Sequence, residues 1–408
     1  MKKKIRYSFR SSPAYSFGRG IKRCIQEIRN GVIDRNHPER KVVSLYPETP
    51  SKGKVLFSYI IDGFLLGPDA YIPKTHTNIW QSIKMAETFL ELGYAVEVIH
   101  YLNHTFVPEG NYAFFVDVRH NMQRLTPLLN KDCVKIMHID SAHIVFHNAA
   151  EAKRILELQQ RRGITMRPRR FEMPNLCIEH ADYATTCGND FTIGTFQYAK
   201  KKIFKLPSPC GIRLDLPQRD YESIRRNFLW FSSSGSVLKG LDLALDVFKD
   251  MPDYHLTVCG PVERDKAFVR EYRKELFETS NIHTVGWVDL DSQQFKDLTS
   301  SCVAMLHLSC SEGGAPSVKM CMHSGLIPVV SCETGVDVDD FGFTLKKCTL
   351  PNIKEIVTYV STLSNAALKE KGRKSWEHAR RCHTRENFSK EFRKVVLKII
   401  EAVPVRDV

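Results

Sequence analysis

The chain alternates short apolar segments with longer amphipathic ones along most of its length, and this alternation restricts the folds open to it. The short segments are rich in β-branched and aromatic residues, which favours strands, and the longer ones carry apolar residues at helical spacing. Strands are expected at residues 54–61, 94–101, 112–118, 133–140, 183–187, 202–206, 228–232, 254–259, 282–287, 303–308 and 327–331. Helices are expected at residues 77–92, 149–162, 241–248, 266–277, 295–298, 317–324 and 386–402. Such an order predicts an α/β protein with parallel sheets and right-handed crossovers.

The pattern breaks near residues 207–227, where prolines and Gly211 interrupt it. A chain of 408 residues exceeds one ordinary core, so two domains are expected. The expected divisions are a basic N-terminal leader (1–50), an N-terminal Rossmann-like domain (51–210), a C-terminal Rossmann-like domain (226–380) and a C-terminal amphipathic helix that packs back across the junction (381–408). The carboxyl ends of both sheets would face one cleft, where open α/β sheets bind ligands.

The formal net charge of +13 admits nucleic acid, an anionic membrane surface or phosphorylated small molecules as partners. Basic residues are spread along the chain, and neither aromatic RNA-binding motifs nor zinc-finger spacing occur, so no nucleic acid partner is expected. Residues 2–29 alternate basic and apolar side chains, which suits either peripheral membrane contact or a helix packed on the body. No apolar run reaches membrane-spanning length and no signal-peptide core follows the basic start. A cytoplasmic protein is expected, with the inner membrane face as a second location.

The 12 cysteines contain no C-x-x-C pair, so zinc-ligand spacing is missing. Cys310, Cys321 and Cys332 are spaced at eleven residues, which places them on different elements. Buried free thiols are the expected state of these residues.

Residues 312–318, Glu-Gly-Gly-Ala-Pro-Ser-Val, carry the most informative chemistry. They follow an expected strand, and Pro316 suits the first turn of a helix, whose free amides attract phosphate. Glycines let a ligand approach the backbone closely, and Glu312 is placed to accept hydrogen bonds from sugar hydroxyls. The residues expected to line this phosphate and sugar site are Glu312, Gly313, Gly314, Ala315, Pro316, Ser317 and Val318.

This segment resembles the retaining family-4 glycosyltransferases, which have the GT-B fold. Their pattern is Glu, seven residues, a second Glu, then a glycine and a Pro-Val strand. The chain matches it at Glu312, Gly325 and the 328–329 strand, but Met320 stands in place of the second glutamate. In the family that carboxylate holds the nucleotide ribose, so the resemblance leaves the nucleotide open.

Residues 231–242 resemble the strand, loop and Lys-Gly helix start of the same family. The resemblance implies that Lys239 neutralises the donor diphosphate and that Ser234 and Gly235 line the donor site. A cation about 4 Å from the charge, at an effective dielectric near 20, contributes roughly 4 kcal/mol. The family's loop under the base corresponds to Trp287 and Val288, although Trp287 also suits core packing.

The resemblance implies that the N-terminal domain (51–210) lies on the acceptor side and that the C-terminal domain (226–380) binds the nucleotide-sugar donor. The N-terminal half resembles the family mainly in layout. His138 ends an expected strand, where relatives carry a histidine near the donor sugar, and His143 is the alternative. A neutral imidazole there would bind a hydroxyl or accept its proton, but a histidine at a strand end is as often structural. Asp62, Gly63 and His76 are expected on the acceptor or phosphate side of the cleft.

Two D-x-D triplets occur, one at residues 289–291 and one within residues 337–340. They are candidate metal ligands, since GT-A glycosyltransferases hold a metal-bound nucleotide in this way. The first precedes an expected helix, where aspartate commonly caps, and neither lies in the N-terminal half that a GT-A enzyme would use. No metal site is expected.

The resemblance implies transfer of a sugar from a nucleoside-diphosphate sugar to a glycan, a lipid-linked acceptor or another acceptor, with retention and without a metal or further cofactor. Glu312, Lys239 and His138 are the expected catalytic residues. Two alternatives stay open: a non-catalytic protein that binds nucleotide sugars or glycans, which Met320 favours, and a GT-B sugar-nucleotide epimerase, which needs an acidic partner for Glu312.

Overall fold

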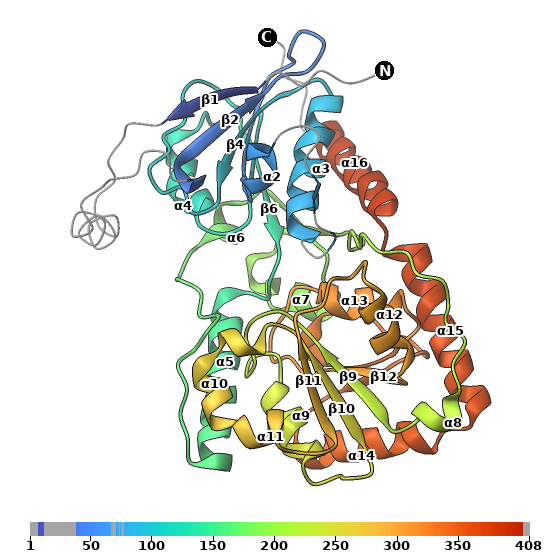
Figure 1. The fold of residues 1–408 in the computed structure, drawn as a ribbon. Helices are drawn as coiled ribbons and strands as arrows, with labels where there is room; N and C mark the ends of the chain where they lie inside the picture. Colours follow the sequence, from blue (N-terminus) through green and yellow to red (C-terminus); the bar gives the residue numbers. More distant parts are fainter. Residues whose placement is uncertain (1–6, 12–37, 67–70, 73, 75–76, 403–408) are drawn as a thin grey trace.

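The computed structural model describes residues 7–11, 38–66, 71–72, 74 and 77–402. These residues form two α/β domains, each built around one sheet (Figure 1). In the order of the first sheet, its strands are β1 (Tyr7–Ser11), β2 (Lys41–Leu45), β4 (Ala95–His100), β3 (Lys54–Tyr59), β5 (Phe114–Asp117), β6 (Val134–Ile139), β7 (Tyr183–Thr186) and β8 (Lys202–Lys205). The second sheet runs β11 (Ile282–Gly286), β10 (His255–Cys259), β9 (Asn227–Phe231), β12 (Ala304–His307), β13 (Ile327–Ser331) and β14 (Phe343–Leu345).

Strand pairing is parallel throughout the second sheet and from β4 to β8 in the first. The exceptions are β1 and β2, which pair antiparallel with each other, while β2 also pairs antiparallel with β4. The predicted α/β class with parallel sheets is therefore confirmed. The region expected to be a basic leader contributes these two strands, and the amphipathic stretch at residues 12–29 lies outside the described residues.

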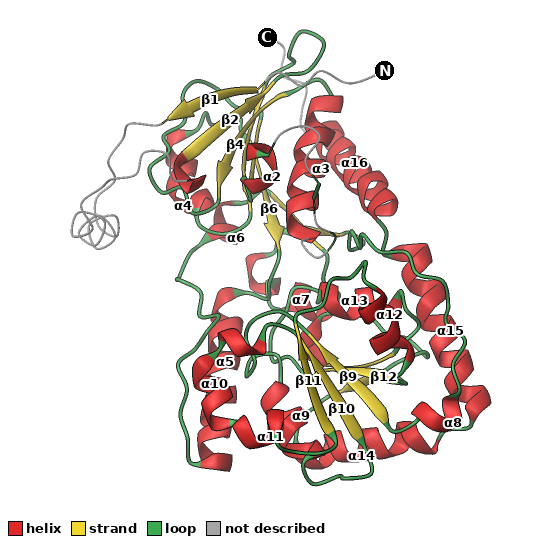
Figure 2. Ribbon diagram, in the orientation of Figure 1, coloured by secondary structure: helices red, strands yellow, loops and turns green. Residues whose placement is uncertain are grey.

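Helices cover both faces of each sheet (Figure 2). In the N-terminal half they are α2 (Asp62–Leu65), α3 (Thr77–Glu91), α4 (Asn121–Leu125), α5 (Ile144–Arg162), α6 (Cys177–His180) and α7 (Asp190–Gly194). In the C-terminal half they are α8 (Tyr221–Ile224), α9 (Leu241–Phe248), α10 (Lys266–Glu271), α11 (Arg273–Phe277), α12 (Gln293–Ser300), α13 (Pro316–Met322), α14 (Leu350–Thr362), α15 (Asn365–Cys382) and α16 (Arg385–Ala402).

Four apolar clusters correspond to the four sheet faces. Helices α3 and α16 fill one face of the first sheet, and α4 and α6 fill the other. On the second sheet, α9, α10, α11 and α14 pack on one face, and α12, α13 and α15 on the other. The helix expected over residues 266–277 is broken at Tyr272 into α10 and α11.

Helix α5 begins in the N-terminal half but packs on the C-terminal domain, beside α10 in Figure 1. Its Ile155 and Leu158 belong to the apolar cluster of the second sheet. Arg161 donates hydrogen bonds of 2.7 Å to both Asp242 and Asp246 of α9, whose side chains are 0% and 2% exposed. The predicted end of this helix at Gly163 is confirmed. Gly163 has a φ of +68° and caps α5 in the left-handed conformation that glycine adopts readily.

Helix α16 crosses in the opposite direction and packs on the N-terminal domain. The ring of Phe388 lies 6.1 Å from that of Trp80, and Phe392 lies 6.2 Å from Phe89, both partners being in α3. The two domains are thus joined by exchanged helices as well as by the segment near residue 210. No helix among the described residues combines the length and the apolar character that crossing a membrane requires.

Because α5 is held to the second domain by buried charges, Arg161→Ala should lower the free energy of unfolding by about 3 kcal/mol, since it leaves buried carboxylates short of a partner. Chemical denaturation measures this change. Lys153→Ala on the same helix, whose side chain is 78% exposed, is the matched control and should change stability by less than about 0.5 kcal/mol. Equal stability of both variants would show that α5 does not brace the domains.

Candidate active site

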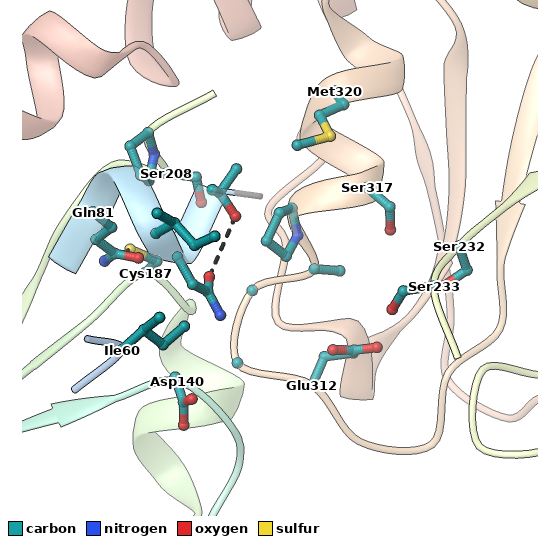
Figure 3. A pocket seen from close by; sticks show the side chains of 18 of the residues that line it. Ile60, Gln81, Asp140, Cys187, Ser208, Ser232, Ser233, Glu312, Ser317 and Met320 are labelled. Carbon is teal, nitrogen blue, oxygen red and sulfur yellow. Dashed lines mark hydrogen bonds between the residues drawn. The ribbon is translucent and has the colours of Figure 1, made fainter. Parts of the chain in front are cut away.

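The carboxyl ends of both sheets open onto one cavity between the domains, with a volume of about 340 Å³. Parallel strands end at the same edge, so the loops that follow them converge there. Residues at or just after β3, β5, β6 and β7 line one wall: Tyr59, Ile60, Arg119, His138, Ile139, Asp140 and Cys187. Residues after β9, β11 and β12 line the other: Ser232, Ser233, Lys239, Trp287, Val288, Glu312, Gly313, Gly314, Ala315, Pro316, Ser317 and Met320. Figure 3 shows Gln81, Asp140 and Cys187 facing Glu312, Ser317 and Met320 across this space.

A buried ion pair between Lys239 and Glu312 is the main charged feature of the C-terminal wall. The Lys239 ammonium donates a hydrogen bond to Glu312 Oε1, and the side chains are 7% and 13% exposed. The sequence assigned the two residues to diphosphate and sugar separately, whereas the structure joins them. Burial acts to raise the pKa of Glu312, but the Lys239 charge and the nearby His307 ring outweigh it and hold that pKa well below its ordinary value.

Gly240 explains why Lys239 reaches this position. Its φ is +71°, and a Cβ there would lie 2.5 Å from the carbonyl oxygen of Leu308. Only glycine lets the start of α9 press against the end of β12 in this way. The contact brings Lys239 against the loop that follows β12, which carries Glu312.

His307, at the end of β12, lies under the ion pair and was not predicted. It is fully buried, and its Nε2 is 3.5 Å from Glu312 Oε1. Burial lowers the pKa of His307, so its ring is neutral at neutral pH. The ring therefore separates Glu312 from the core without adding a second positive charge.

His138 lies in the cavity wall as predicted, but both of its ring nitrogens have partners within the protein. Nε2 is 2.8 Å from the side-chain nitrogen of Gln81, and Nδ1 is 2.8 Å from the hydroxyl of Thr185. Burial lowers the pKa of His138 to about 4. This histidine is neutral and held in a fixed orientation.

The loop that carries Glu312 is pressed against the N-terminal domain. A Cβ on Gly313 would lie 2.4 Å from the carbonyl carbon of Asp140, and one on Gly314 would lie 2.4 Å from the carbonyl oxygen of Cys187. His147 of α5 contacts the same loop, with its Nδ1 2.9 Å from the hydroxyl of Ser311. The glycines thus allow the closest contacts between the two halves at the cavity.

Several residues of the site were missed by the sequence reasoning. Arg119 forms a bidentate salt bridge with Asp140: its Nε donates to Oδ1 at 3.1 Å and its Nη2 donates to Oδ2 at 3.0 Å. The two residues lie at the ends of two neighbouring strands. Lys319 is 3% exposed and donates to the carbonyl of Cys187 and the hydroxyl of Ser208, both at 2.8 Å. Position at a strand end was a usable signal for both residues, because Arg119 directly follows the strand predicted at 112–118 and Asp140 is the last residue of the strand predicted at 133–140. No local pattern marks Lys319.

Some predicted site residues lie outside the cavity. Val318 N–H donates to the carbonyl of Ala315 at 3.1 Å, so the expectation that it is free for phosphate is wrong. The His143 side chain accepts a hydrogen bond from Val145 N–H and caps α5. A Cβ on Gly63 would lie 2.6 Å from Ile83, so this glycine serves the packing of α2 on α3. The remaining residues without a place in the cavity lining are Ser234, Gly235 and Asp62, and His76 lies outside the described residues.

Trp287 lines the cavity and is 51% exposed, so the alternative of core packing is wrong, while its neighbour Val288 is buried.

The D-x-D carboxylates have partners on the protein: Asp291 pairs with Lys74 at 2.8 Å, and Asp337 accepts from Asn189 at 2.9 Å. The described cysteines are all free thiols.

No protein-family model and no curated protein sequence matches the chain. Solved structures do. Sucrose-phosphate synthase from Thermosynechococcus elongatus aligns over 86% of this chain and 100% of its own, at 12% identity and a TM-score of 0.58. Anabaena HepE in complex with UDP and glucose aligns over 86% and 100%, at 12% identity and a TM-score of 0.51. WaaG, a glycosyltransferase involved in lipopolysaccharide biosynthesis, aligns over 84% and 99%, at 12% identity and a TM-score of 0.50.

These likenesses define the class of fold: the chain has the GT-B fold, as its sequence predicted. The chain spans only 54% of the length of TarM, another matched structure, with a TM-score of 0.47. Membership of family 4 within the GT-B proteins stays a prediction.

Gly313→Ala tests the contact between the loop and the N-terminal domain. The added Cβ would meet backbone atoms of Asp140, which cannot move aside as a side chain does, so the free energy of unfolding should fall by about 1–3 kcal/mol. Gly194→Ala is the matched control, because a Cβ there meets nothing within 4 Å. Denaturant titration of both variants measures the difference, and equal values would contradict the close approach.

His138 should make stability depend on pH. Its pKa is about 4 in the folded protein and about 6.5 when unfolded, so the unfolded chain binds the extra proton between these values. The stability that the neutral ring provides is complete above pH 6.5 and is lost as the pH falls toward 4, by about 2 kcal/mol between pH 7 and pH 5. Unfolding free energies of wild type and His138→Gln at both pH values measure it. The variant should lose about 2 kcal/mol less over this range, and an equal loss would refute the assignment.

Proposed function

We propose that the protein is a glycosyltransferase that moves a sugar from a nucleoside-diphosphate sugar to an acceptor bound in the cleft. The observation that carries this proposal is the buried Lys239–Glu312 pair on the C-terminal wall of the cavity between two GT-B domains. A diphosphate bears more negative charge than one carboxylate, so it can compete with Glu312 for the ammonium. Release of Glu312 then turns that carboxylate toward the hydroxyls of the donor sugar.

Catalysis in this proposal comes from charge and position. The leaving nucleoside diphosphate gains negative charge as the glycosidic bond breaks, and Lys239 opposes that charge in a site largely shielded from water. About 4 kcal/mol of such stabilisation, if made only in the transition state, corresponds to roughly a thousandfold in rate. Little general-base chemistry is needed. We therefore propose transfer with retention and without a metal ion, which product stereochemistry and activity in the presence of EDTA would test.

UDP-sugars are the first donors to test, because HepE was crystallised with UDP and glucose and with UDP-glucose. The acceptor in this proposal is a glycan or a lipid-linked saccharide, and peripheral contact with an anionic membrane belongs to the same proposal. Met320 lines the cavity and is 4% exposed, so the ribose site must do without a carboxylate at this position.

Substitutions at the two members of the ion pair should have different effects on UDP binding. Lys239→Ala should weaken UDP binding at least tenfold, because the cation that meets the diphosphate is removed. Glu312→Gln leaves the ammonium without its competing anion, so UDP binding should be unchanged or tighter while sugar transfer falls at least a hundredfold. Isothermal titration with UDP and an assay of UDP release from UDP-glucose measure the two effects.

Lys266→Ala, at an exposed position away from the cavity, is the control and should behave as wild type. Wild-type UDP affinity in Lys239→Ala would remove this residue from the donor site. Wild-type protein that binds UDP-glucose without releasing UDP, with or without saccharide acceptors, would instead favour a sugar-nucleotide-binding protein.

A further inference from the structure

The N-terminal wall of the cavity is polar, yet most of its buried polar groups already have partners. Both ring nitrogens of His138 are occupied, by Gln81 and Thr185. Both carboxylate oxygens of Asp140 accept hydrogen bonds from Arg119. These groups shape the wall, but their hydrogen bonds are satisfied without a ligand.

Tyr59 is the exception on this wall. It ends β3, lines the cavity and is 2% exposed, and its hydroxyl has no hydrogen-bond partner among the described residues. Its ring centroid lies 5.8 Å from that of His138, which is itself fixed. Burial raises the pKa of Tyr59, so its hydroxyl keeps its proton and can donate. A buried hydroxyl without a partner is unfavourable, and a ligand hydroxyl would relieve it.

Ser232 has the same property on the opposite wall. It directly follows β9, lines the cavity and is 4% exposed, and its hydroxyl also has no partner within the described part of the chain. Within the described residues, a cavity-lining residue at the end of each sheet thus carries a buried hydroxyl that lacks a hydrogen bond. The two hydroxyls come from different domains.

The order of the elements decides which part of a ligand each hydroxyl would meet. Ser232 and Lys239 belong to the same loop region of the C-terminal domain, which begins after β9. The Glu312–Gly314 loop lies between this region and the N-terminal wall, because Gly313 contacts the backbone of Asp140. A ligand with its diphosphate at Lys239 and its sugar at Glu312 therefore presents what lies beyond the sugar to the wall that holds Tyr59.

We propose that Tyr59 is a specificity residue that hydrogen-bonds a hydroxyl of a polyhydroxylated acceptor, while Ser232 binds the donor. This inference rests on the proposed glycosyl transfer and adds to it a named residue that contacts the acceptor. The acceptor then carries a second hydroxyl near the one that receives the sugar. A simple alcohol or a deoxy sugar that lacks this group would be a poor acceptor.

The test compares single-atom changes on the two walls, with UDP-glucose as donor and the mono- or disaccharide that most accelerates UDP release as acceptor. Tyr59→Phe should raise KM for that saccharide about five- to tenfold, because one neutral hydrogen bond to the acceptor is lost. KM for UDP-glucose should not change. Ser232→Ala should do the reverse. Tyr198→Phe removes the hydroxyl of a 53% exposed tyrosine of the same domain, outside the cavity, and should leave both values unchanged.

Deoxy analogues of the saccharide distinguish recognition of the acceptor from a purely structural role of Tyr59, because a structural role would not make kcat/KM depend on one particular hydroxyl of the acceptor. For wild type, one analogue should lose about five- to tenfold in kcat/KM, and for Tyr59→Phe that same analogue should lose nothing further. Unchanged acceptor kinetics in Tyr59→Phe, or a raised KM for UDP-glucose instead, would overturn the assignment. Wild-type protein that binds none of a panel of nucleoside diphosphates, and releases none of them from their sugars, would overturn the proposed function itself, which is a different result.

Discussion

The Lys239–Glu312 pair is the interaction on which the site depends, because it holds two opposite charges together inside the protein. Gly240 permits the close packing that brings Lys239 to Glu312, and Gly313 and Gly314 permit the N-terminal domain to approach from the other side. A buried pair is weakly stabilising by itself, but removal of either partner leaves an expensive isolated charge. Such a pair is suited to exchange, since an incoming anion can replace the carboxylate without leaving the cation unpaired.

The neutral groups around the pair set its local electrostatics. His138 and His307 are both buried with lowered pKa values, so neither adds positive charge beside Lys239 at neutral pH. Lys319 is buried without a carboxylate partner among its hydrogen bonds and ties α13 to the N-terminal domain. Lys239 is therefore the buried cation of the C-terminal wall, and Arg119 and Arg170 add further positive charge to the cavity lining.

Much of the fold followed from the sequence because strand and helix periodicities are local. The Glu312 and Lys239 segments were found for the same reason: each combines a strand end, glycines and a charged residue within a few positions. Most of what failed was non-local. The His143 ring contacts the hydroxyl of Tyr198, which is distant in the sequence, and the unpaired hydroxyl of Tyr59 can be recognised only from the three-dimensional structure. Residues 41–45 join the sheet by antiparallel pairing with β4, which their basic surroundings concealed.

The exchange of helices gives the chain a topology that its order along the sequence does not suggest. Helix α5 precedes the C-terminal domain in the sequence but packs on it. Helix α16 follows the C-terminal domain in the sequence but packs on the N-terminal domain. The core of each half is complete only when a helix from the other half packs on it. Cutting the chain at the proline-rich segment near residue 210 would therefore yield two fragments, each without one of the helices that cover its sheet. Any opening of the cleft must bend the chain on both sides of α5 as well as at the segment near residue 210. The hinge is therefore distributed over several connecting segments and is not confined to a single linker.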